Sequence, residues 1–99
     1  MSLERRRHVR KPTNLETLWA PITGTYSKGP VRIRDISQSG ARLEVDHPVA
    51  PGDRVRIQLT SVVEARLIYV QQTPQGKWMT GCQFDFELTE EEMEPLIRN

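Results

Sequence analysis

Hydrophobic and polar residues alternate with a period of two along most of the chain. The alternation is clearest in ARLEV (residues 41–45), RVRIQL (54–59) and WMTGCQFDF (78–86). Because successive side chains of a strand point to opposite faces, these segments are predicted to be strands with one buried face. SVVEARLIYVQ (61–71) is rich in β-forming residues but alternates less regularly. LETLWAPITGTY (15–26) predicts a weaker strand, which Pro21 places at the edge of a sheet.

Residues typical of turns separate the predicted strands. They form the segments QSG (38–40), HPVAPGD (47–53) and TPQG (73–76). About six short strands in a chain of 99 residues indicate one all-β domain, either a small antiparallel barrel or a sandwich.

The C-terminal segment LTEEEMEPLIRN has a different pattern. Thr89 and Glu92 have the spacing of a capping box, and Leu88 and Met93 that of a hydrophobic staple. These signals predict a short C-terminal α-helix. Pro95 conflicts with the prediction, because proline removes a backbone hydrogen bond inside a helix.

The alternation breaks inside VRIRDISQSG (31–40). Strict continuation would bury the carboxylate of Asp35, which is costly without partners, whereas Ile36 is the better core residue. A β-bulge near Asp35 would shift the phase, so that Ile36 points inward and Asp35 and Ser37 point outward together. Gly40 then allows a positive φ or the close approach of a ligand to the backbone. The break therefore predicts a binding site.

The charges are unevenly distributed along the chain. The first eleven residues contain Arg5, Arg6, Arg7, Arg10 and Lys11 but only one acidic residue, whereas the remainder has nine basic and twelve acidic residues. We therefore divide the chain into a basic N-terminal arm (1–12) and a barrel domain with a C-terminal helix (13–99). The arm has too little apolar surface to offset its ordering entropy, so we expect it to be flexible until a ligand binds.

An acid, a hydroxyl and several arginines together suit a guanine nucleotide. A carboxylate accepts two parallel hydrogen bonds from the N1–H and N2–H₂ groups of guanine, and a serine hydroxyl beside it donates or accepts another. Guanidinium groups pair with phosphate oxygens or with guanine O6 and N7, and stack on bases. Arg6 and Arg10 are four residues apart, which places them on one face of an extended or helical arm.

The sequence resembles the PilZ domain family, whose members are receptors for the bacterial second messenger cyclic di-GMP. RRHVR (6–10) matches an R-x-x-x-R motif, and DISQSG (35–40) matches D-x-S-x-x-G. GCQF (81–84) is similar to the closing strand of the family, and the resemblance covers nearly the whole chain. Ser39 departs from the pattern, since many members have a second glycine there. The resemblance implies a six-stranded antiparallel barrel with a helix, no catalysis, no cofactor and cyclic di-GMP as the ligand.

The resemblance also implies roles for the motif residues. Arg6 and Arg10 would hold the phosphates and guanine edges, Asp35 and Ser37 would hold guanine, and Gly40 would leave room for it. Binding would order the arm and so signal to a downstream protein or to a fused effector domain.

Three further residues are candidates for the same ligand. Arg5 precedes the motif, and family members with an arginine there tend to accept a stacked pair of cyclic di-GMP molecules. Arg7 is a candidate phosphate contact. Trp78 is a candidate stacking face, although it shares the parity of Cys82 and Phe84, which favours a place in the core.

Other functional classes find less support in the sequence. Cys82 is the single cysteine, which fits a reducing cytoplasm. His8 and His47 lack the spacing of metal ligands, Ser37 lacks the pattern of a hydrolase nucleophile, and no P-loop is present. No apolar run reaches the roughly 20 residues of a membrane span, so we expect no membrane contact. Two alternatives stay open: a nucleic-acid-binding β-barrel that uses the basic arm, and a protein-interaction module that binds no nucleotide.

Overall fold

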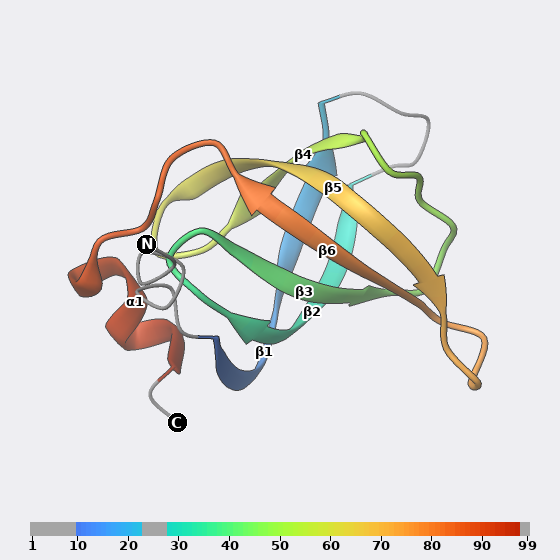
Figure 1. Ribbon diagram of the computed structural model, residues 1–99, viewed down its shortest axis with the longest axis horizontal. Coiled ribbons are helices and arrows are strands. Elements are labelled where there is room, and N and C mark those ends of the chain that lie inside the picture. The colour runs from blue at the N-terminus through green and yellow to red at the C-terminus, as the bar shows by residue number, and fades with distance from the viewer. Residues whose placement is uncertain (1–9, 23–27, 98–99) are drawn as a thin grey trace, which may run out of the picture.

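A closed antiparallel barrel forms the body of the molecule (Figure 1). The computed structural model describes residues 10–22 and 28–97. In these residues the strands follow each other around the barrel in the order β1-β2-β3-β6-β5-β4. Their bounds are β1 Lys11–Pro21, β2 Gly29–Ile36, β3 Gly40–Val45, β4 Arg54–Gln58, β5 Val62–Gln72 and β6 Trp78–Phe84, and the helix is α1 Glu90–Ile97. The predicted barrel and C-terminal helix are confirmed.

The alternating side chains of the strands fill the barrel. In β3, for example, Ala41, Leu43 and Val45 are buried and Arg42 is exposed, as the period of two predicts. The largest fully buried side chains come from all six strands; they are Trp19, Ile33, Ile36, Leu43, Ile57, Leu67, Val31, Val45, Val55 and Thr80. Removing this apolar surface from water is the main stabilising contribution, at about 25 cal/mol per Å².

The first strand is not an edge strand. Its residues pair with β2 from Lys11↔Ile36 to Trp19↔Gly29, and with β4 from Trp19↔Ile57 to Pro21↔Val55. The prediction from Pro21 is wrong because the barrel closes through β1, and Pro21 is tolerated as the last residue of the strand. The strand also begins at Lys11, inside the segment that the sequence assigned to the arm.

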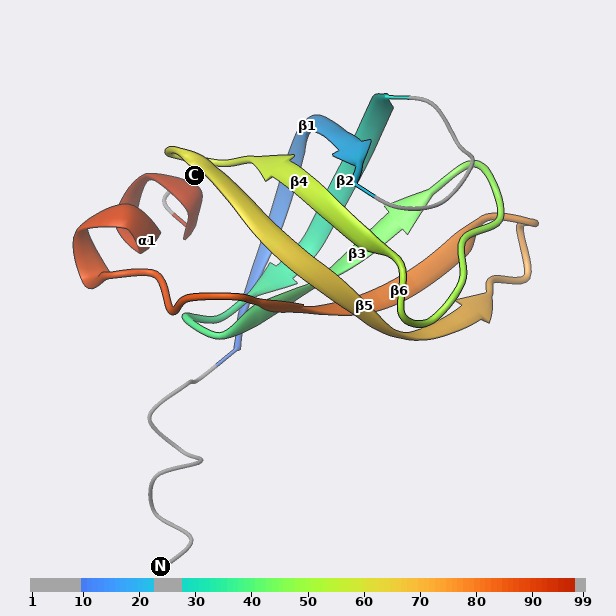
Figure 2. The ribbon, with the colours of Figure 1, turned by 90° about the horizontal axis from the view of Figure 1, so that it is seen from above.

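The helix covers the end of the barrel where the β2–β3 and β4–β5 turns lie (Figure 2). Its N-terminus has the predicted capping box, since Thr89 N donates to Glu92 Oε1 at 2.8 Å and Glu92 N donates to Thr89 Oγ1 at 3.1 Å. The helix also continues through Pro95. Burial of Met93 and Leu96, and a 2.9 Å hydrogen bond from Thr13 Oγ1 to Leu96 O, hold the turn around this proline.

Candidate functional site

The predicted bulge interrupts the pairing of β2 with β3. Ile33 pairs with Leu43, and after a register shift Asp35 pairs with Arg42. Ile36 points into the core, as expected. Asp35 lies on the same outer face as its exposed partner Arg42, as the phase shift predicts. However, only 6% of Asp35 and 2% of Ser37 is exposed, so neither residue is open to solvent.

The Asp35 carboxylate is buried because two arginines cover it. Arg10 Nη1 donates to Oδ1 at 2.8 Å, and Arg42 Nε and Nη2 both lie 2.6 Å from Oδ2. Charge-assisted hydrogen bonds of this kind are the strong ones. We call Arg10, Asp35 and Arg42 the Asp35 cluster. Both arginine side chains are 49% exposed, so the cluster presents two guanidinium groups outward above one carboxylate.

Arg42 is a candidate site residue that the sequence did not reveal. Its place in ARLEV makes it one of several polar residues on an outer strand face, and nothing in the alternation distinguishes it. The feature that could have identified Arg42 is the bulge, because it brings Arg42 opposite Asp35. The hydrogen bond with Asp35, and next the negative charge of Asp35, raise the pKa of Arg42, so this group stays charged.

An aromatic ring continues the site across the barrel surface. Gly81 pairs with Arg42 on one side and with Tyr69 on the other. A Cβ at Gly81 would overlap the Tyr69 ring, with Cζ only 2.8 Å away, so the ring lies against the backbone of Gly81. Tyr69 is partly exposed, and a hydrogen bond with its side chain also raises the pKa of Arg42.

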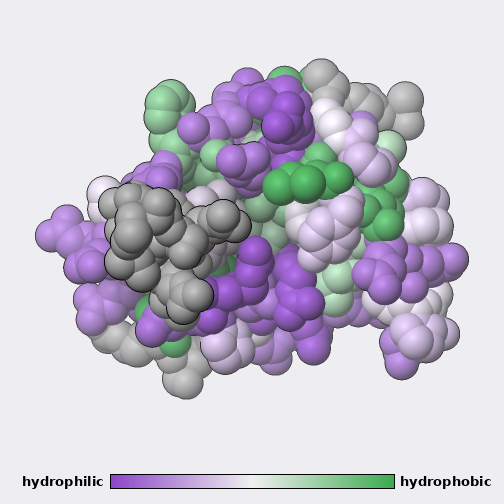
Figure 3. All heavy atoms as spheres, in the orientation of Figure 1, coloured by the Kyte–Doolittle hydropathy of each residue, from purple (hydrophilic) through white to green (hydrophobic). Residues whose placement is uncertain are grey.

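Asp35, Arg42, Gly81 and Tyr69 therefore form a row across β2, β3, β6 and β5. On this face of the barrel, hydrophilic side chains gather over β3 (Figure 3). A cationic surface next to an aromatic ring can hold a phosphate and stack a base at the same time. Tyr69 was also missed in the sequence, because only the pairing of β3 with β6 and of β6 with β5 brings it toward Arg42.

Ser37 and Gly40 close the turn between β2 and β3. Ser37 N donates to Gly40 O at 2.8 Å, and Ser37 Oγ accepts from Ser39 N at 3.3 Å. Of the two reasons expected for a glycine at position 40, a positive φ does not apply, since among the described residues only Gly52 and Gly76 have one. Its close backbone approach is to β6, because a Cβ at Gly40 would overlap the carbonyl oxygen of Cys82.

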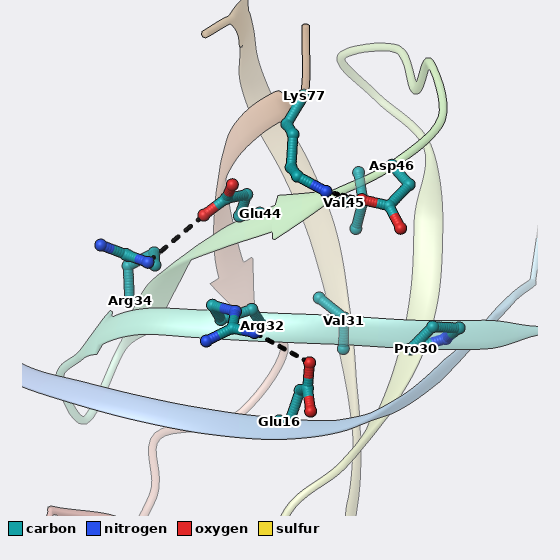
Figure 4. A pocket seen from close by; sticks show the side chains of 9 residues that line it. All are labelled: Glu16, Pro30, Val31, Arg32, Arg34, Glu44, Val45, Asp46 and Lys77. Carbon is teal, nitrogen blue, oxygen red and sulfur yellow. Dashed lines mark hydrogen bonds and ion pairs between the residues drawn. The ribbon is translucent and has the colours of Figure 1, made fainter. Parts of the chain in front are cut away.

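A second charged region lies farther along β2 and β3. This hollow of about 260 Å³, which we call the outer hollow, has three ion pairs (Figure 4). They are Arg32–Glu16 at 3.0 Å, Arg34–Glu44 at 3.4 Å and Lys77–Asp46 at 2.6 Å. Because its three cations are balanced by three carboxylates, the outer hollow offers no excess positive charge to an anion.

Comparison with known families decides the assignment of the chain. The family described as PilZ domain matches residues 4–99. This chain belongs to the PilZ domain family. PilZ domains bind rather than catalyse, and membership implies in general the role of a cyclic di-GMP receptor. No curated protein matches the chain.

The PilZ motif residues are placed to different extents by the structure. It brings Arg10 and Asp35 into direct contact, and Ser37 and Gly40 lie in the adjoining turn. Arg5, Arg6 and Arg7 lie outside the described residues. Trp78 is not brought to the cluster: it begins β6 at the end away from this turn, pairs with Val45, and packs partly buried against the core.

The described part of this PilZ domain contains neither a reactive thiol nor a group of metal ligands. Burial raises the pKa of the Cys82 thiol to about 12, so it carries no reactive thiolate at neutral pH. Within residues 10–22 and 28–97, no three histidine, cysteine or acidic side chains are grouped as metal ligands. The same residues contain no helix with the length and apolar character of a membrane span.

Proposed function

We propose that this PilZ domain binds cyclic di-GMP over the Asp35 cluster. The observation that carries the proposal is the pairing of one nearly buried carboxylate with two half-exposed arginines from neighbouring segments. The cluster has an excess of one positive charge, which suits the phosphates of the ligand. Its carboxylate has the two parallel acceptors that the N1–H and N2–H₂ edge of guanine requires.

Binding requires an exchange of partners at Asp35. Arginines occupy both carboxylate oxygens in the structure, so guanine has to replace at least one of them. A displaced guanidinium does not lose its partner, because the same ligand offers phosphate oxygens and guanine O6 and N7. The exchange therefore replaces one set of charge-assisted hydrogen bonds by another.

Other residues complete the proposed site. Arg6 and Arg7 would contact phosphates next to Arg10, and Arg5 would cap the outer base of a stacked pair of ligands. The partly exposed ring of Tyr69 would stack on a base, the role first expected of Trp78. Ser37 would contribute its hydroxyl to guanine from the turn beside Asp35.

Binding would also supply the signal. Arg10 connects residues 1–12 to the cluster, so a ligand that takes over Arg10 acts directly on the arm. We propose that the ligand orders the arm, and that the changed surface is read by a partner protein or effector domain in the bacterial cytoplasm. Cyclic di-GMP should then slow trypsin cleavage at residues 5–11. Equal cleavage at saturating ligand would contradict this step.

Isothermal titration with cyclic di-GMP tests the receptor assignment. We expect Arg10→Ala to lower the affinity about 100-fold, because each charge-assisted hydrogen bond contributes roughly 1.5–3 kcal/mol. The matched control is Arg34→Ala, which removes an equally exposed arginine from the outer hollow and should leave the affinity unchanged. The titration also counts ligands: with a stacked pair the parent binds two per chain, and Arg5→Leu lowers the count toward one.

The alternatives give different outcomes in the same assay. A parent that binds no cyclic di-GMP refutes the receptor assignment. If the parent instead binds single-stranded DNA with an affinity that falls steeply with salt, the result supports a nucleic-acid-binding barrel that uses the basic arm. Binding of neither would favour the nucleotide-independent interaction module.

A further inference from the structure

A groove lies at the end of the barrel that α1 covers. It has a volume of about 270 Å³ and runs between the start of β5, the segment 85–89 that connects β6 to α1, and the first turn of α1. Its most informative lining residues are Val62, Glu64, Asp85, Phe86, Glu87 and Glu92. We call it the Phe86 groove.

Phe86 is exposed to an unusual degree for a large apolar side chain. The sequence pattern of WMTGCQFDF predicts that Phe86 is buried like Phe84, and this expectation is wrong. The strand ends at Phe84, the chain turns, and Leu88 becomes the next buried residue while 86% of Phe86 remains exposed. Val62, 55% exposed, lines the same groove. Exposed apolar side chains in a polar rim mark interaction sites, because covering them with a partner removes them from water.

The rim of the groove is acidic. Four of its lining residues are carboxylates, and residues 85–97 include six acidic side chains and no basic one. Arg54 pairs with Glu64 and Asp85 and so offsets part of this charge at one side. The other two carboxylates of the groove, Glu87 and Glu92, come from the connecting segment and from α1. An apolar anchor within an acidic rim is complementary to a basic segment that carries one large apolar side chain.

One wall of the groove is hydrogen-bonded to the turn of the proposed nucleotide site. Phe84 N donates to Ser39 O at 2.9 Å, and Leu88 N donates to Gln38 O at 2.8 Å. Gln38 Nε2 donates back to Leu88 O at 3.0 Å. The two ends of the segment that carries Phe86 are therefore attached to the D-x-S-x-x-G turn.

We propose that the Phe86 groove is the docking site for a basic segment of a partner protein, which inserts an apolar side chain beside Phe86 and Val62. The docking site itself does not depend on the nucleotide. Only its control by cyclic di-GMP, through the turn at Gln38 and Ser39, rests on the proposed function.

A short peptide probe tests the docking site by NMR. The probe has four lysines around one central phenylalanine, and is titrated into the ¹⁵N-labelled chain. We expect the amide shifts to concentrate at residues 62–64 and 85–92. Phe86→Ser should weaken binding about ten-fold, as truncation of a central anchor does. Ile68→Ser removes another half-exposed apolar residue outside the groove and is the matched control, which should bind like the parent.

Two further peptides separate charge from the anchor. Replacing the phenylalanine by serine, or the four lysines by glutamates, should abolish the concentrated shifts. Shifts spread evenly over acidic residues, or undiminished by Phe86→Ser, would overturn the proposal. So would self-association of the parent that Phe86→Ser removes in sedimentation, because the groove would then bind a second copy.

The same variants keep this proposal separate from the receptor assignment. Phe86→Ser should bind cyclic di-GMP with the affinity of the parent, because Phe86 is not part of the Asp35 cluster. If the parent fails to bind cyclic di-GMP, the receptor assignment fails and the peptide result stands. If the nucleotide binds and the peptide does not map to the groove, the docking proposal alone is wrong.

Discussion

The Asp35 cluster and the outer hollow are both made of charged side chains on β2 and β3, but they differ in burial and in charge balance. In the outer hollow each carboxylate has one cation from the ion pairs described above, and the side chains of Glu16 and Asp46 are largely exposed. In the Asp35 cluster one nearly buried carboxylate has two arginines. Exposed pairs contribute little, because water competes for both partners and salt screens them.

The difference favours the Asp35 cluster over the outer hollow as the region that binds an anion. A buried acceptor fixes the positions of its arginines, and the excess charge stays available at the surface. A balanced, exposed set of pairs fixes little and attracts neither sign. Counting charged residues alone would favour the outer hollow, which has twice as many of them.

The largest effect should come from Asp35→Asn. We expect it to lower the affinity for cyclic di-GMP about 100-fold, since the amide presents a donor where guanine also donates and loses charge-assisted hydrogen bonds. Glu44→Gln makes the same chemical change in the outer hollow and should leave the affinity unchanged. Calorimetric titration of both variants tests the contrast. Equal losses would show that the two regions do not differ in function.

A smaller effect is expected at the aromatic end of the row. Gly81→Ala places a methyl group where the Tyr69 ring lies, and so displaces the ring from its position beside Arg42. Stacking of a base on an aromatic side chain contributes about 1–3 kcal/mol, so the affinity should fall roughly ten-fold. Tyr69→Phe keeps the ring and should retain most of the affinity. Unchanged binding by Gly81→Ala would confine the site to the Asp35 cluster.

The smallest effect should be that of Asp46→Asn in the outer hollow. The hydrogen bond from Lys77, and next its charge, lower the pKa of Asp46. A lowered pKa in the folded state stabilises the protein above the ordinary aspartate pKa, and this stabilisation is lost as the pH falls through the lowered value. Thermal unfolding as a function of pH should therefore show a slight loss of stability in the variant at neutral pH. A difference that persisted in strong acid would need another cause.

Local pattern predicted much of the fold and part of the site. Alternation predicted the strands, and the cost of burying Asp35 predicted the bulge, because both follow from residues close in sequence. The closure of the barrel through β1 depends on a pairing with β4, which Pro21 does not encode. Arg42 and Tyr69 were missed for the same reason, since only the registers of separate strands bring them toward Asp35.

The burial of Asp35 was misjudged for a related reason. A carboxylate is expensive to bury without partners, so Asp35 was expected to be exposed. The structure instead provides the partners, with Arg10 and Arg42 on neighbouring segments. An unpaired carboxylate is indeed costly to bury, but the two arginines that pair with Asp35 lie outside residues 31–40, where the alternation breaks.

The glycine at position 40 has a consequence for how relatives of this chain are interpreted. A side chain there would overlap the Cys82 carbonyl even if no ligand were ever bound. During evolution, selection for folding alone would therefore retain this glycine, with or without a ligand. A descendant that had lost its ligand would still have the last residue of the D-x-S-x-x-G signature. In this barrel, Gly40 is therefore informative about the fold and not about the ligand.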